Sequence, residues 1–280
     1  MRLIRENPSL LIGGSVVAAI VAFAAFSPLL SPYDVETMDM ANRFAWPSAE
    51  HWLGTDNFGR DLWTRMAQGA RVSVFIAVVS VVIATIIGTI VGLVTGYFGG
   101  WIDLVFMRVV DVFLGFPPII LALAIVAALG PGSRNLILAL AAVFWTEYAR
   151  VVRSVTLAQR EIDYVAAVRA IGASHTRILI VEILPNVIGP IIVLSTLGLG
   201  TAIIAESGLS FLGFGVQPPT PTWGWTLSYG TRYMRSEPWL SIVSGLAIML
   251  TVLGFNLFGD GLRDLLDPRG VARKVKRGDI

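Results

Sequence analysis

Few side chains in this 280-residue chain could carry out chemistry. The chain has no cysteine, which excludes thiol catalysis, cysteine metal sites and disulfides. Its two histidines, His51 and His175, fall on opposite sides of the membrane in the topology derived below, so they cannot share a metal ion. A Gly-x-x-x-x-Gly-Lys-Ser/Thr phosphate loop and a Ser-His-Asp constellation are also missing. The sequence thus predicts no catalytic residue, no metal site and no cofactor bound by this chain.

The remaining candidates are charged residues within apolar segments. Glu147 and Arg150 are spaced i and i+3, as are Arg108 and Asp111, so each pair can meet on one face of a helix. Glu206 is a single acid toward the outer end of another apolar run. Charged groups inside a membrane face a partner or water. We expect structural pairing of the first four residues rather than substrate contact, whereas Glu206 could serve as scaffold or line a pore.

The apolar segments must position these residues. Hydrophobic residues make up 55% of the chain and charged residues 14%, against about 25% charged in an average soluble domain. Six runs have the ~20 residues that a helix needs to cross a bilayer. They are residues 10–30, 72–97, 109–129, 136–155, 186–214 and 240–258. The sequence therefore predicts an all-α integral membrane protein with six transmembrane helices.

The first run has an alternative interpretation. Ala22-Phe23-Ala24 has the small-x-small form of a signal-peptide cleavage site. We favour a membrane span, because the apolar run continues to Leu30.

Glycine and proline predict how two of the spans pack. Gly88, Gly92 and Gly96 recur every fourth residue on one face, which lets a neighbouring helix approach closely. Pro117 and Pro118 remove backbone hydrogen bonds and predict a kink or unwound turn in the third span. Because irregular backbone inside a membrane is tolerated only against protein or a water-filled cavity, Pro117 points to a pore.

The distribution of basic residues predicts that both termini are cytoplasmic. With the N-terminus inside, residues 1–71 hold the first span and an outer loop that ends in an amphipathic helix over 62–68, and residues 72–268 form the core. Residues 269–280 are a basic tail suited to anionic lipid headgroups. Fourteen of the 21 basic residues then lie inside: Arg2, Arg5, Arg108, Arg150, Arg153, Arg160, Arg169, Arg177, Arg263, Arg269, Arg273, Lys274, Lys276 and Arg277.

A polar stretch over residues 160–185 interrupts the apolar second half of the chain. We call its central part, residues 163–177, the knuckle. Ala166 and Ala167 belong to a predicted compact helix with few bulky side chains, so the surface of another protein could come close to its backbone. Charged residues flank this helix and could set electrostatic register with a partner: Asp163, Arg169 and Arg177.

The knuckle also contains signals that end and start helices. Gly172 is placed to end the first helix in the left-handed conformation. Ser174 could cap a second helix that runs to Pro185. The predicted result is a helix-turn-helix that projects from the membrane into the cytoplasm.

This segment resembles the cytoplasmic loop signature of the permease subunits of bacterial ABC importers. That signature reads Glu-Ala-Ala, three residues, Gly, nine residues, Ile, one residue, Leu-Pro. Here the spacing is intact, but Ala166 stands in place of the family's Glu and Glu182 in place of its Ile. In the family, the knuckle docks into a groove on the ATP-hydrolysing subunit. The resemblance implies an ATPase-coupling segment that contains Asp163, Ala166, Ala167, Arg169, Gly172, Ala173, Leu184 and Pro185.

Other segments are similar to the dipeptide, oligopeptide and nickel importer group of these permeases. They include residues 51–61 and 69–73 before the second span, residues 205–213 around Glu206, and residues 259–268. The resemblance covers nearly the whole chain and implies the type I ABC importer permease fold in the inner membrane of a bacterium.

The resemblance also implies partners and a substrate. The partners would be a second homologous permease, two ATP-binding subunits that carry ATP and Mg, an extracytoplasmic solute-binding protein and membrane lipid, with no nucleic acid. The expected substrate is a dipeptide or oligopeptide, and nickel chelates or another small solute are the alternative.

Two other classes of protein compete with this interpretation. An ion-coupled secondary transporter usually has charged or broken-helix ion sites near mid-membrane and inverted repeats, but mid-membrane charge is scarce here and we find no convincing repeat. A membrane enzyme would need a catalytic cluster, which the sequence lacks.

Overall fold

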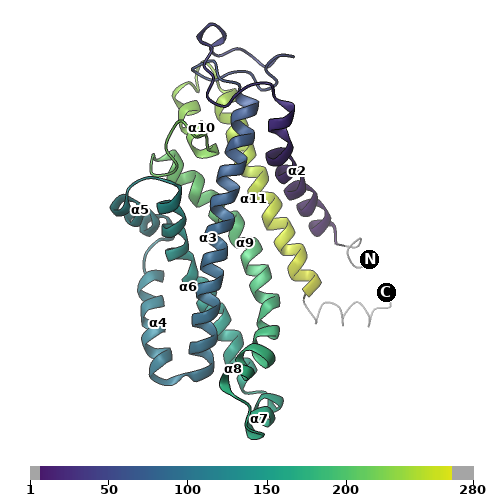
Figure 1. Ribbon diagram of the computed structural model, residues 1–280, viewed down its shortest axis with the longest axis vertical. Helices are drawn as coiled ribbons and strands as arrows, with labels where there is room; N and C mark the ends of the chain where they lie inside the picture. Colours follow the sequence, from purple (N-terminus) through teal and green to yellow (C-terminus); the bar gives the residue numbers. More distant parts are fainter. Residues whose placement is uncertain (1–6, 267–280) are drawn as a thin grey trace.

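A computed structural model describes residues 7–266, which form a bundle of long helices (Figure 1). The long helices are α2 (Pro8–Leu30), α3 (Leu62–Phe98), α6 (Ser133–Arg160), α9 (Leu184–Phe211) and α11 (Trp239–Leu266). The shorter segments are η1 (Met40–Asn42), α4 (Gly100–Leu114), α5 (Pro118–Leu129), α7 (Asp163–Ala170), α8 (His175–Arg177), the π-helical η2 (Ile178–Ile183) and α10 (Trp223–Arg232). Arg2, Arg5 and the predicted basic tail lie outside the described residues.

Five segments are long and apolar enough to cross a membrane: Pro8–Ser27, Leu62–Phe98, Ser133–Arg160, His175–Phe211 and Trp239–Leu266. Helices α4 and α5 pass the same test only as a pair, and they are bent by 92°. The number of spans is therefore six if this pair is counted as one. The predicted all-α membrane architecture is confirmed.

The helices connect two ends of an elongated molecule. Figure 1 shows the loop between α2 and α3 at one end, together with α10, and shows α7 and α8 at the other end. We call this loop, residues 31–61, the outer loop. Helix α3 starts at the outer loop and ends near the knuckle, so one helix joins the two regions.

The predicted glycine face packs α3 against α6. A Cβ atom added at Gly92 would lie 2.6 Å from Cβ of Val152, and one added at Gly96 would lie 2.7 Å from Cβ of Thr156. Gly88 meets Tyr148 in the same way. The glycines thus allow two long helices to approach more closely than any side chain would permit.

An arginine holds the end of α2 against α3. Pro28 has no N–H, so the carbonyl of Ala24 lacks its usual partner four residues later in the helix. Arg71 of α3 donates to this carbonyl oxygen and, at 2.9 Å, to that of Ala25. The proline therefore creates a free acceptor that the neighbouring helix satisfies.

The start of α3 differs from the prediction. The amphipathic helix expected over 62–68 and the span expected over 72–97 form one helix that begins at Leu62. Asp61 caps this start by accepting a hydrogen bond from the backbone N–H of Thr64 at 2.8 Å. Gly69 lies within this helix, and a Cβ atom added there would lie 3.1 Å from Cδ1 of Trp223.

The last helix continues past its predicted end at residue 258 and reaches Leu266. Gly259 and Gly261, which we expected to follow the span, lie within the helix. They allow close packing, since a Cβ at Gly259 would meet Leu197 and one at Gly261 would meet Leu10.

The third predicted span, 109–129, is two helices. Helix α4 already begins at Gly100 and ends at Leu114. Helix α5 then starts at Pro118. The helix is interrupted at Pro117, as predicted, and the angle of 92° between α4 and α5 is larger than that of a simple kink. Between α9 and α11, the short helix α10 forms next to the prolines at 218, 219 and 221.

Candidate functional site

A glycine ends the first helix of the knuckle, as its position in the sequence predicts. Gly172 has a φ of 84°, in the left-handed region. The backbone N–H of Ala173 donates to the carbonyl of Val168 at 3.3 Å, and that of Gly172 donates to the carbonyl of Arg169 at 3.0 Å. These two bonds form a Schellman motif, which satisfies the free carbonyls at the end of α7.

The second helix starts where the sequence predicts and ends elsewhere. Ser174 accepts a hydrogen bond from the backbone N–H of Arg177 at 3.3 Å, so it caps α8. The helix does not stop at Leu184-Pro185, because the chain continues through η2 into α9. Pro185 lies in the first turn of α9, so its missing N–H falls at the junction with the π-helical turn of η2. The knuckle is therefore joined to α9 without a loop.

One face of α7 is fixed to the protein and the other is exposed. Val165 is fully buried and packs in a cluster with Ile178 and Ile183 of η2. Ala166 and Ala167 are exposed. Ile171, next to the turn, is 84% exposed. The exposed face offers small and apolar side chains on a rigid support.

The charged residues of the knuckle match the helix dipole. Asp163 lies in the first turn of α7 and Arg169 in the last, each at the end of the helix where its charge is favourable. Both side chains are exposed, as is Arg177.

Tyr164 connects the start of α7 to the start of α9. Its hydroxyl donates to the carbonyl of Glu182 at 3.1 Å and accepts from Nδ2 of Asn186 at 3.2 Å. Glu182, which replaces the family's Ile, is a partly buried side chain of η2.

The charged pairs predicted within single helices form between helices. Arg150 of α6 pairs with Asp111 of α4 at 3.1 Å, rather than with Glu147. Arg153 pairs with Asp103 of α4. Each of these arginines reaches an acid on the helix that packs beside it. Arg108 and Glu147, the other two residues of the predicted pairs, are exposed.

Glu206 is enclosed by its own helix bundle. The residue is fully buried, and its carboxylate accepts hydrogen bonds from Ser210 at 2.8 Å and from Ser207 at 3.3 Å. This environment suits a scaffold role, because the side chain has no exposed area within this chain. Pro117, in contrast, is exposed at the break between α4 and α5.

The outer loop contains a buried ionic network that the sequence analysis missed. Asp56 pairs with Arg60 at 2.7 Å and with Arg65 at 3.4 Å, and all three are at most 6% exposed. Asp56 also accepts from the backbone N–H groups of Phe58 and Arg60. The alternation of Asp and Arg around residues 56–65 was the available signal.

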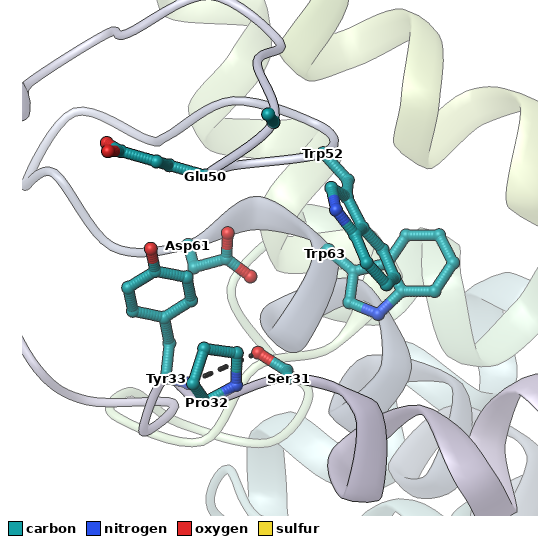
Figure 2. A pocket seen from close by; sticks show the side chains of 8 residues that line it. Ser31, Pro32, Tyr33, Glu50, Trp52, Asp61 and Trp63 are labelled. Carbon is teal, nitrogen blue, oxygen red and sulfur yellow. Dashed lines mark hydrogen bonds between the residues drawn. The ribbon is translucent and has the colours of Figure 1, made fainter.

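Residues of the outer loop and the start of α3 also line a cavity of about 190 Å³ with both acidic and aromatic walls. Figure 2 shows Glu50 and Asp61 around it with Tyr33, Trp52 and Trp63. The rings of Trp52 and Trp63 meet edge to face with centroids 4.9 Å apart. The pocket is part of the folded outer loop.

The two histidines have separate partners at opposite ends of α3. His51 Nδ1 lies 2.9 Å from Asp61, next to the start of α3, and His175 Nδ1 lies 2.8 Å from the hydroxyl of Tyr97, in its last turn. Among residues 7–266, no group of three or more His, Cys, Asp or Glu side chains could hold a metal ion.

Comparisons with known proteins identify the family. Residues 88–270 match the model of the binding-protein-dependent transport system inner membrane component, and residues 1–47 match that of the N-terminal transmembrane domain of oligopeptide transport permease C. The second match favours a membrane span over a signal peptide for α2.

Individual relatives agree over nearly the full chain. A dipeptide transport system permease protein from Alkalihalophilus pseudofirmus is 45% identical over 266 residues, which cover 95% of this chain and 88% of the relative. Glutathione transport system permease proteins from Escherichia coli O6:K15:H31 and Shigella boydii serotype 4 are each 44% identical over 254 residues, or 90% of this chain and 84% of theirs. The chain therefore belongs to the binding-protein-dependent inner membrane components, and it is a multi-pass permease subunit of a peptide-type ABC importer.

Proposed function

We propose that this permease imports short peptides as part of an ATP-driven complex. A second homologous permease would complete the translocation pathway, and an extracytoplasmic solute-binding protein would deliver the substrate. Two ATP-binding subunits would hold ATP and Mg, and this chain would bind no cofactor. Both termini and the knuckle would be cytoplasmic, with the outer loop on the other side of the membrane.

The exposed face of α7 is the observation that carries this proposal. Ala166 and Ala167 present small side chains on a helix whose opposite face is anchored through Val165. A partner that displaces α7 would therefore also displace η2, against which Val165 packs. Because α8, η2 and α9 form one continuous path from the knuckle, displacement there would reorient a membrane span. We assign ATPase coupling to this segment, with Asp163, Arg169, Gly172 and Ala173 holding or orienting it.

Short peptides are the proposed substrate because two differently named groups of relatives share that chemistry. One relative is named for dipeptide transport and others for glutathione, itself a short peptide. Nickel chelates remain the alternative.

The test is reconstitution of the complete importer in liposomes. We expect ATP-dependent uptake of labelled dipeptide or glutathione, and co-purification of the ATP-binding subunits with this chain. Uptake driven by an ion gradient without ATP-binding subunits would instead support a secondary transporter and overturn the proposal. ATP-dependent uptake of a nickel chelate and of neither peptide would overturn the substrate assignment alone.

A further inference from the structure

Three side chains contact the last turn of α3. They come from the end of α6, from α7 and from α8, which follow one another in the sequence. Arg160, at the end of α6, donates from Nη1 to the carbonyl oxygens of Gly96 at 3.1 Å and Tyr97 at 3.3 Å. The guanidinium of Arg169, in α7, lies 5.4 Å from the centre of the Tyr97 ring. Nδ1 of His175, in α8, lies 2.8 Å from the Tyr97 hydroxyl. Tyr97 is thus contacted through its backbone, its ring and its hydroxyl group.

Two of these contacts satisfy polar groups that would otherwise lack a hydrogen-bond partner. The carbonyls of Gly96 and Tyr97 belong to the last four residues of α3, whose carbonyl oxygens receive no hydrogen bond from within the helix. Tyr97 is only 5% exposed and packs in the same cluster as Val165, Ile178 and Val152. A buried tyrosine hydroxyl needs a hydrogen-bond partner, and His175 supplies it.

Chain connectivity shows why this contact matters. The knuckle is covalently continuous with α6 on one side and with α9 on the other, through α8 and η2. Helix α3 is not adjacent to the knuckle in the sequence, but it packs tightly on α6 through Gly92 and Gly96. The molecule near the knuckle therefore consists of an α3–α6 pair and an α8–η2–α9 arm. At this end of the molecule, the apolar contacts of the cluster around Tyr97 and the bond between Tyr97 and His175 join the first to the second.

We propose that Tyr97 is the positioning residue that makes the α3–α6 pair follow the α9 arm when α7 is displaced. This inference rests on the proposed coupling role of α7 and adds the route by which the movement reaches α3. Without the bond to His175, the knuckle would still dock on the partner, but the end of α3 would follow the displacement of α7 less fully.

The test is the number of substrate molecules imported per ATP hydrolysed by the reconstituted importer. Tyr97→Phe removes the hydroxyl and keeps the ring over which Arg169 lies. We expect the ratio to fall about five-fold, which corresponds to the loss of one hydrogen bond. His175→Leu should give the same fall, and His175 is exposed, so this variant does not disturb the core. The double variant should fall no further than either single one.

Two further variants separate positioning from packing. His175→Asn keeps a polar group near the position of Nδ1. We expect its ratio of imported substrate to hydrolysed ATP to be closer to the wild-type value than that of His175→Leu. Tyr233→Phe is the control, because Tyr233 packs edge to face on Phe44 of the outer loop, at the other end of the molecule from the knuckle. It should leave the ratio unchanged.

The outcomes distinguish this inference from the proposed function. If wild-type protein does not co-purify with the ATP-binding subunits or shows no ATP-driven uptake, the proposed function fails. If wild-type protein is coupled and Tyr97→Phe keeps the wild-type ratio, only the role of Tyr97 is overturned. Additive losses in the double variant, or a loss with His175→Asn equal to that with His175→Leu, would also overturn it.

Discussion

The charged residues that directly precede α3 in the outer loop are buried, whereas those of the knuckle are exposed. In the outer loop, Asp56, Arg60 and Asp61 are at most 6% exposed and bond to groups of the same region. In the knuckle, Asp163 and Arg177 are exposed. Asp34, Glu36 and Glu50 of the outer loop are exposed as well, so the difference lies in residues 56–61, which satisfy one another, whereas the knuckle leaves its charged and small residues open to a partner.

Glycine shows the same contrast. Gly59 and Gly172 both have positive φ, of 72° and 84°. A Cβ at Gly59 would overlap the carbonyl oxygen of Asp39, but a Cβ at Gly172 would meet nothing within 4 Å. The outer loop thus needs its glycine for space and for conformation, and the knuckle needs its glycine for conformation alone.

The largest loss of stability should follow Asp56→Ala. This change leaves the buried guanidinium groups of Arg60 and Arg65 without their acid, and breaking one side of a buried ion pair costs about 3–5 kcal/mol. We expect low abundance in the membrane and a lower unfolding temperature in detergent. Asp163→Ala is the control, and as an exposed substitution it should change stability by less than about 0.5 kcal/mol. Equal losses from both variants would remove the contrast between the two regions.

A smaller effect should separate the two glycines. Gly172→Val forces a β-branched residue into the left-handed region, which costs about 1–2 kcal/mol and affects only the turn. We expect near-normal insertion with loss of substrate uptake. Gly59→Ala should instead reduce abundance, because the added carbon has no space. Normal uptake by Gly172→Val would show that the orientation of the knuckle is unimportant.

A milder change is expected from Tyr164→Phe. It removes the hydroxyl that bonds to Glu182 and Asn186, at a cost of about 0.5–1.5 kcal/mol. Hydrogen exchange of the α7 backbone should become faster while the outer loop is unaffected. Unchanged exchange would indicate that the packing of Val165 alone holds α7.

The smallest effect on stability should come from Ala167→Trp, because this side chain is exposed. The indole would prevent close approach of a partner, so we expect normal abundance and unfolding temperature with reduced recovery of ATP-binding subunits and little uptake. Ala167→Ser, which preserves the small size, should behave as wild type. Full uptake by the tryptophan variant would show that the ATP-binding subunit does not contact α7 at Ala167.

Local signals made the knuckle predictable from the sequence. Gly172 ends its helix and Ser174 caps the next one through bonds to residues within five positions, so their types and spacing were sufficient. The continuation of α8 into α9 was missed, because Pro185 reads as a stop but is equally compatible with the first turn of a helix.

Contacts between distant residues could not be predicted in this way. Arg150 pairs with Asp111 and not with Glu147, because the choice depends on how α4 packs beside α6. The role of Tyr97 depends on three elements that meet only in the folded chain. The predicted end of the last helix was wrong for a related reason. Gly259 and Gly261 favour a helix end in the sequence alone, but in the fold they allow close packing within α11.

Disulfide cross-linking at the knuckle tests the central claim most directly. The chain has no native cysteine, so a single cysteine at Ala166 is the only thiol it offers. With cysteines scanned along the groove of the ATP-binding subunit, we predict a cross-link that stops uptake and is reversed by a reductant, while a cysteine at Ala41 in the outer loop gives none. Absence of any cross-link from Ala166 in an assembled, active importer, or labelling of that cysteine by an impermeant reagent from the outside, would contradict the account.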